Sequence, residues 1–150
     1  MSNSDDDGME GRLPHWFVPG AVHFVTWRCH RESRAVNGPE RQLVLDTVRR
    51  FDGVRYHLSA VVVMNDHAHA LVVPIAPENL KDTVEDWKSI SAKDINRLRR
   101  CDGVEVWQAE SFDRVMRNAR ETEVKLKYIA NNPWKRWPFL REYPWLWSSG

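Results

Sequence analysis

Two histidines one residue apart interrupt one of the most hydrophobic stretches of the chain. The segment 61–73 reads VVVMNDHAHALVV, in which His67 and His69 follow an Asn-Asp pair. Successive side chains of a β-strand alternate between the two faces of a sheet, so both imidazoles are expected to project to the same side. Two neutral imidazoles on one face can form half of a divalent-metal site. A pair of histidines hydrogen-bonded at a strand edge is the alternative, and the spacing alone does not exclude it.

A second set of polar residues lies near the C-terminus, in the segment KLKYIANNP. Tyr128 and Asn132 are four residues apart and therefore lie on one face of a helix, together with Val124, which we expect to dock the helix on a sheet. If the helix crosses near the histidines, Asn132 can offer an amide oxygen as a third ligand, and Tyr128 would face a substrate on the same metal. Such an open set suits Mg²⁺ or Mn²⁺ better than a closed zinc site. Taken singly, Asn132 could instead be a helix C-cap and Tyr128 a core ring.

Both segments resemble the signature motifs of the single-tyrosine HUH transposases, which act on single-stranded DNA. VVVMNDHAHALVV resembles their strand of two histidines around a hydrophobic residue, and KLKYIANNP is similar to their tyrosine helix, whose usual form is Tyr-Ile-x-x-Asn-Pro. Four further blocks resemble the REP-associated tyrosine transposase branch, in the order of that family: LPHWFVPGAVHFVTWR (13–28), DWKSISAKDIN (86–96), VWQAESFDR (106–114) and YPWLWSS (143–149). Together the blocks cover about residues 12–149.

The resemblance implies an α+β, ferredoxin-like fold and a DNA-cleaving activity. His67, His69 and Asn132 would bind Mg²⁺ or Mn²⁺, and Tyr128 would attack a DNA phosphate to form a 5′-phosphotyrosine intermediate. The expected partner is single-stranded or hairpin DNA formed by palindromic repeats, bound by a monomer or a homodimer. Two other functions remain open: a DNA-hairpin-binding protein on the same scaffold that does not cleave, and a small metallohydrolase that uses the two histidines alone.

The hydrophobic pattern predicts the strands and helices that position these residues. Alternating apolar residues predict strands at 21–28, 55–64, 67–73 and 104–108, with the Asn-Asp pair as the turn of a hairpin. Helices are predicted from Asn37-Gly38-Pro39 to Asp52-Gly53, from Pro77 to about Arg99, and from Asn118 to Asn132, where Pro133 is expected to end the helix. Glu121, three residues after Asn118, predicts a capping box. The order β-α-β-β-α-β plus a helix predicts a ferredoxin-like antiparallel sheet with two helices on one face and the C-terminal helix on part of the other.

Basic residues are concentrated in the C-terminal third. The first ten residues hold four of the 21 acidic residues and no base, so 22 bases face 17 acids in the remainder. A basic patch suits a polyanion such as DNA, although a solvated helix face has the same composition. Tryptophans interleaved with the bases, at 134, 137, 145 and 147, could stack on unpaired nucleobases. The candidates for phosphate contacts are Lys88, Arg114, Arg117, Lys125, Lys127, Lys135 and Arg136, of which Lys88 rests on the family resemblance alone.

The 150 residues are expected to form an acidic, disordered lead-in at 1–12 and a single domain at 13–150. No apolar run approaches the ~20 residues of a membrane span, and the N-terminal segment lacks the apolar core of a signal peptide. The two cysteines, Cys29 and Cys101, are far apart, which argues against a disulfide framework or a cysteine-based zinc site. The expected location is therefore the reducing cytoplasm.

Overall fold

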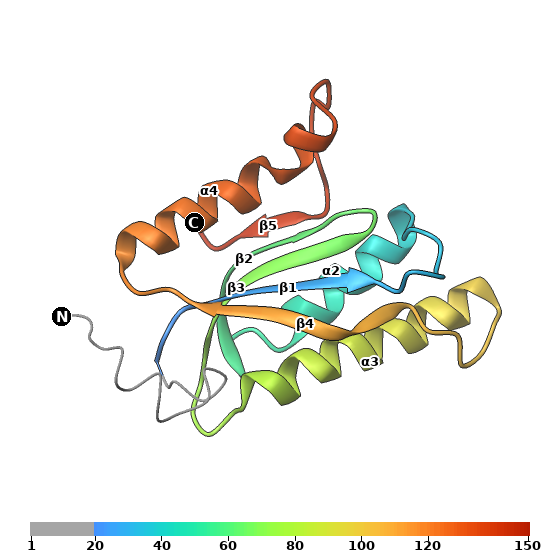
Figure 1. Cartoon of the computed structure of the whole chain (residues 1–150), viewed down its shortest axis with the longest axis horizontal. Helices are drawn as coiled ribbons and strands as arrows, with labels where there is room; N and C mark the ends of the chain where they lie inside the picture. Colours follow the sequence, from blue (N-terminus) through green and yellow to red (C-terminus); the bar gives the residue numbers. More distant parts are fainter. Residues whose placement is uncertain (1–19) are drawn as a thin grey trace.

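The computed structural model describes residues 20–150, so the predicted lead-in and the beginning of the block at 13–28 lie outside the described residues. The elements are, in chain order, β1 (His23–Cys29), α2 (Gly38–Arg50), β2 (Tyr56–Val63), β3 (His67–Pro74), α3 (Leu80–Arg99), β4 (Trp107–Val115), α4 (Ala119–Arg136) and β5 (Leu146–Ser148). All neighbouring strands are antiparallel, in the order β4-β1-β3-β2-β5 (Figure 1). The first four strands have the predicted ferredoxin-like order. The fifth was not predicted, because three residues are too few to show an alternating pattern.

The sheet separates α2 and α3 from α4 (Figure 1), and each face carries a hydrophobic cluster. On one face, Val25 and Trp27 of β1 and Ala68 of β3 pack with residues of α2 and α3. On the other face, Phe24 of β1 packs with Ile129 of α4. The predicted arrangement of two helices on one face and the C-terminal helix on the other is therefore confirmed. No helix in the described part of the chain is long and apolar enough to cross a membrane.

Two elements continue past their predicted ends. Strand β4 begins at Trp107 rather than 104 and continues to Val115, because it is an edge strand whose many polar residues need no buried partner. The last helix passes through Pro133 and ends at Arg136. Pro133 is buried, and in the final turn its missing N–H removes a single intrahelical hydrogen bond, so packing outweighs the preference of proline to end a helix.

Helix caps explain where the helices begin. Asn37 and Glu40 form a full capping box at the start of α2, with the side chain of each bound to the backbone N–H of the other. At α4 only half of the predicted box forms. The Asn118 side chain accepts from the Glu121 N–H at 2.9 Å, but the Glu121 carboxylate accepts from the backbone N–H and the guanidinium of Arg117. The α3 helix begins three residues later than predicted, because Asn79 caps it by accepting from the backbone N–H of Lys81.

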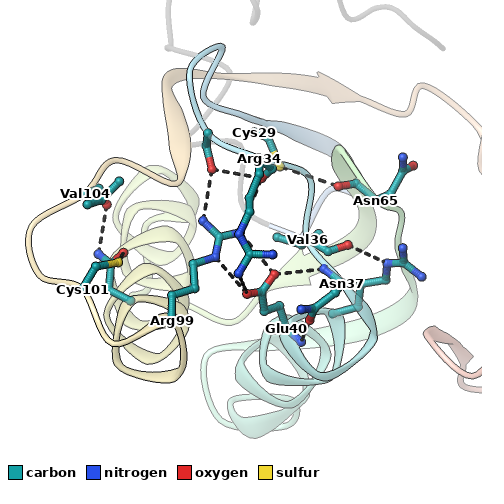
Figure 2. A network of polar contacts seen from close by, with 12 residues as sticks. Cys29, Arg34, Val36, Asn37, Glu40, Asn65, Arg99, Cys101 and Val104 are labelled. Carbon is teal, nitrogen blue, oxygen red and sulfur yellow. Dashed lines mark hydrogen bonds and ion pairs between the residues drawn. The ribbon is translucent and has the colours of Figure 1, made fainter.

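A buried polar network holds the turn between β2 and β3 (Figure 2). The backbone N–H groups of Cys29 and Val36 donate to the carbonyls of Asp66 and Asn65, at 2.9 and 2.8 Å. The segment that carries Val36 is anchored in turn by Glu40, which is 1% exposed and accepts from Arg99 of α3 at 2.8 Å. The helices on one face of the sheet thus support the turn from which the two histidines follow.

Candidate metal and nucleophile site

The two histidines of β3 project together toward α4, as the strand alternation predicts. Their ring centroids are 4.7 Å apart. His69 lies opposite Thr26 of β1 in the sheet register, and His67 lies opposite Arg28. Because Ala68 points to the α2 and α3 face, the strand can be buried on one side and present two imidazoles on the other.

Each imidazole is oriented by a second side chain through its Nδ1 atom. His69 Nδ1 lies 2.7 Å from Thr26 Oγ1, and His67 Nδ1 lies 2.7 Å from the Asp66 carboxylate. This pattern, in which Nδ1 is occupied and Nε2 is left free, is typical of histidines that bind a metal through Nε2. The sequence prediction did not include Thr26 or Asp66. The alternation of β1, which places residue 26 on the same face as Phe24, is the signal that could have identified Thr26.

The Nε2 atoms of the two rings have different surroundings. His69 Nε2 is buried and has no hydrogen-bond partner among the described residues. His67 Nε2 lies 3.3 Å from Asn132 Oδ1. A His67 that donates through Nδ1 to Asp66 has an acceptor at Nε2, so it faces another acceptor in Asn132 unless a cation or a proton lies between them. The orphaned nitrogen and the facing acceptors fit a cation bound by His67, His69 and Asn132.

The His69 ring of this site is uncharged at neutral pH, and the nearby Asp66 carboxyl is ionised. Burial, and then electrostatic interactions with His67, Arg28 and Lys125, lower the pKa of His69 to about 3, so its ring is neutral at physiological pH. Burial opposes ionisation of Asp66, but the hydrogen bond from His67 and electrostatic interactions with His67 and Arg136 hold the pKa of this carboxyl below its usual value. Between residues 20 and 150, no group of three His, Cys, Asp or Glu side chains could hold a metal. Asn132, whose Oδ1 lies 3.3 Å from His67 Nε2, is the candidate for a third ligand.

The α4 helix docks on the sheet through residues other than the one that the sequence predicts. Val124 is 55% exposed and does not dock the helix, so that expectation is wrong. The buried residues Ile129 and Pro133 hold α4 instead, because they lie on the face that meets the sheet. Asn132 at the edge of that face is 8% exposed and points at His67. It is not a C-cap either, since the helix continues to Arg136.

Tyr128 stands at the mouth of the site rather than in the core. Its ring is 39% exposed and lies 5.2 Å from His69 and 6.0 Å from Phe24, centroid to centroid. The Lys125 ammonium lies 5.1 Å from the Tyr128 centroid and 4.5 Å from that of Phe24. These contacts hold the ring beside His69, and Tyr128 as a whole remains 39% exposed.

An open pocket of about 600 Å³ adjoins Tyr128 and His69. Two cations, Arg28 and Lys125, line it. Gln108 and Glu110 of β4 also line the pocket. They lie at a β-bulge, because Trp27 of β1 pairs with residue 111 of β4, whereas Cys29 pairs with residue 107. The sequence prediction did not include Arg28, which the alternation of β1 places on the same face as Thr26. The pocket offers cations and an aromatic wall beside the candidate nucleophile.

The predicted phosphate-binding residues are distributed unevenly around this pocket. Lys125 lines it, Lys135 Nζ lies 6.0 Å from the Tyr128 ring, and Arg136 lies 3.8 Å from the Asp66 carboxylate. Lys127 is exposed on the same helix but does not line the pocket.

Three of the predicted cations have protein partners elsewhere. Arg114 and Arg117 lie 3.7 and 2.7 Å from the Glu121 carboxylate, at the start of α4. Lys88 of α3 is 7% exposed and donates to the Ala109 carbonyl and to Ser111 Oγ. Burial lowers the pKa of Lys88 below its usual value despite the nearby acids. The placement of Lys88 gives no support to a phosphate contact, and we do not retain this residue as a candidate.

Comparison with known proteins bears on the fold. No family model matches the sequence, and no curated protein is significantly similar to it. A solved structure of a REP-associated tyrosine transposase bound to a REP hairpin matches with a TM-score of 0.70 at 16% identity, over 97% of this chain and 82% of that one. A candidate transposase from Deinococcus radiodurans R1 matches with a TM-score of 0.52 at 17% identity, over 77% of this chain and 92% of that one. This chain has the fold of the REP-associated tyrosine transposase.

Proposed function

We propose that this chain is a metal-dependent DNA strand transferase that cleaves and rejoins single-stranded, hairpin-forming DNA. The observation that carries the proposal is the convergence of four side chains from β3 and α4: His67, His69, Asn132 and Tyr128. The match to a transposase bound to a REP hairpin supports DNA as the partner. The proposal explains why an orphaned imidazole nitrogen, an amide oxygen and a half-exposed tyrosine meet in one place.

Some of these residues would bind the metal, and Tyr128 would attack the DNA phosphate. A divalent cation held by His67, His69 and Asn132, Mg²⁺ or Mn²⁺, would supply positive charge to a non-bridging phosphate oxygen. Thr26 and Asp66 would hold the imidazoles in the orientation that exposes Nε2. Phe24 and Lys125 would hold the Tyr128 ring beside the bound phosphate, with the Lys125 ammonium near the anionic strand.

Tyr128 is the proposed nucleophile. Its Oη forms a bond to phosphorus as the phenolic proton leaves, and the bond from phosphorus to the 3′ oxygen breaks. The departing oxygen takes up a proton and becomes a free 3′-hydroxyl, while the 5′ side stays attached to Tyr128 as a phosphotyrosine. Attack by another 3′-hydroxyl reverses the step, so strands are joined without ATP because the diester bond energy is conserved.

The test is a covalent adduct on a denaturing gel. A pool of hairpin oligonucleotides with unpaired flanks, labelled at the 3′ or the 5′ end, is incubated with Mn²⁺ and protein. The 3′-labelled fragment should migrate with the protein, and the 5′-labelled fragment should be released. Tyr128→Phe should abolish the adduct while hairpin binding and thermal stability remain, because only the hydroxyl of a partly exposed residue is removed. Adduct formation by this variant would place the nucleophile elsewhere.

The same reactions separate the alternatives. A hairpin binder gives a complex on a native gel but no cleavage and no adduct on the denaturing gel. A metallohydrolase cleaves without an adduct and retains activity in Tyr128→Phe. His67→Ala or His69→Ala should eliminate cleavage, whereas Asn132→Ala should be milder, because water can replace one neutral ligand. Full activity in excess chelator would refute the metal site.

A further inference from the structure

A second pocket lies past the C-terminal end of α4. It has a volume of about 700 Å³ and is formed by the segment that follows the helix together with Arg41 of α2. We call it the aromatic pocket and define it by Arg41, Arg136, Trp137, Phe139, Tyr143 and Trp145. The proposed reaction uses none of these residues.

The inner walls of the aromatic pocket are anchored to the fold. Trp137 stacks on Tyr143 with centroids 5.7 Å apart and planes at 24°, and Tyr143 Oη donates to the Val63 carbonyl at 2.6 Å. The Arg41 guanidinium lies 5.0 Å from the Trp145 ring centroid and 5.7 Å from that of Trp137. These contacts keep rings and cation in place without a ligand.

Phe139 is the exception, because it is 98% exposed. An aromatic side chain with this exposure can stack on a base that enters the pocket beside it. Its 98% exposure means that packing within residues 20–150 does not account for an aromatic residue at this position.

The aromatic pocket is linked to the candidate site through one arginine. Arg136 lines the pocket and lies 3.8 Å from one Asp66 carboxylate oxygen, while the other oxygen bonds to His67. The wall of the aromatic pocket is therefore two side-chain contacts away from the His67 imidazole.

The side chains of the aromatic pocket indicate which kind of ligand it binds. Aromatic rings together with guanidinium groups match the base and the phosphate of a nucleotide, and base stacking on aromatic residues is tolerant of sequence. One carboxylate, Glu142, also lines the pocket, so a free phosphate ion alone would meet repulsion there. We infer that the aromatic pocket binds an unpaired nucleobase of the DNA strand held at Tyr128, with Phe139 stacked on the base. This inference rests on the proposed function.

The test is a double-mutant cycle between the protein and the DNA. Binding is measured with Tyr128→Phe protein so that the DNA stays intact. Phe139→Ala should weaken binding of a hairpin with unpaired flanks roughly tenfold, and Phe139→Trp should restore it. An abasic nucleotide at one flank position should cause a similar loss, and Phe139→Ala should then add nothing. A blunt hairpin without flanks, the matched control, should bind both proteins equally.

Several results would overturn the inference. The inference is wrong if Phe139→Ala leaves the hairpin affinity unchanged. It is also wrong if the affinity losses from Phe139→Ala and from the abasic nucleotide add independently at every flank position. A change from dimer to monomer in Phe139→Ala, measured by light scattering without DNA, would make the patch a self-association surface instead. Failure of the proposed function is distinguishable, since it removes the adduct with Tyr128 intact but leaves the coupling between Phe139 and the base.

Discussion

The two faces of the sheet are built for different purposes. On the face covered by α2 and α3, Trp27, Tyr56 and Trp87 are almost fully buried, and the Trp87 indole N–H donates to Tyr56 Oη at 3.0 Å. On the other face a single helix lies across the sheet and leaves Tyr128 and the adjoining pocket open. Both faces contain a buried hydrophobic cluster, but only the α4 face combines its cluster with an orphaned histidine nitrogen and a partly exposed tyrosine.

The difference extends to the charged groups. The covered side contains the Glu40–Arg99 pair, whose side chains are 1% and 8% exposed and bind only each other and their neighbours. On the open side, Lys125 and Arg28 line a pocket that can admit a ligand. Glu40 and Arg99 therefore bind each other inside the fold, whereas Lys125 and Arg28 are available to bind a polyanion.

Trp87→Ala should show the largest effect on stability and test the role of the covered face. We expect a loss of about 3–5 kcal/mol in the free energy of unfolding, since the indole is buried between Trp27 and Tyr56. The matched variant on the open face, Tyr128→Ala, should cost about 1 kcal/mol or less. Urea denaturation followed by circular dichroism measures both. Equal losses would mean that the two faces contribute alike.

Glu40→Gln tests the buried ion pair and has a defined pH dependence. We expect a loss of about 3 kcal/mol at pH 7, because Arg99 keeps its charge without a carboxylate partner. Burial opposes ionisation of Glu40, but the hydrogen bonds from Arg99 and Asn37 and the charges of Arg99 and Arg34 lower its pKa below the usual 4.5. The stabilisation is therefore complete above about pH 4.5 and is lost as the pH falls through the lowered pKa.

Unfolding free energies at several pH values between 3 and 7 check this prediction. The difference between wild type and Glu40→Gln should shrink toward the acid end. A difference that stays constant over this range would contradict the assigned pKa shift. Glu32→Gln, an exposed carboxylate in the preceding loop, is the control and should leave the pH dependence unchanged.

Thr26→Val sharpens the comparison at the candidate metal site. Removing the hydroxyl that orients His69 should weaken Mn²⁺ binding about 10–100-fold, measured by calorimetry with the DNA-free protein. The same substitution on the covered face, Thr47→Val, should leave Mn²⁺ affinity unchanged, because Thr47 Oγ1 bonds within α2 to the Leu43 carbonyl. Equal affinities in wild type and Thr26→Val would remove the orienting role.

The smallest effect concerns phosphate contacts on α4. Sequence considerations predict that replacing Lys125 and Lys127 together reduces the slope of log affinity against log salt by up to roughly 1.4. Because Lys125 alone lines the pocket, the structure assigns about 0.7 to Lys125→Ala and almost nothing to Lys127→Ala. Hairpin-DNA affinity across a salt series measures both slopes. A slope change confined to Lys127→Ala would move the DNA path to the outer side of the helix.

Local patterns in the sequence were enough to predict most of the fold. The alternation in β3 places His67 and His69 on one side, and the spacing of four places Tyr128 and Asn132 on one side of α4, because both depend only on backbone geometry. The order of strands and helices likewise predicted the ferredoxin-like sheet. The structure bears out these predictions because strong periodic patterns and compatible tertiary packing agree there.

Patterns that tertiary contacts override could not be predicted in this way. Pro133 continues the helix and Val124 faces water, since burial of Ile129 and Pro133 against the sheet sets the orientation of α4. The three-residue strand β5 exists because the edge of β2 offers it backbone partners. Lys88 carries a charge that the sequence suggests for DNA, but packing between α3 and β4 satisfies it internally.

The sequence by itself determined which side chains can share a face, and the tertiary structure decided which faces meet. That Asn132 reaches His67, 65 residues away, and that Thr26 reaches His69, 43 residues away, follows from helix docking and strand register rather than from spacing. Residue spacing is set by local backbone geometry, whereas contacts between distant segments depend on the burial of apolar surface over the whole domain. The candidate site requires both the local spacing that places residues on one face and the tertiary packing that brings those faces together.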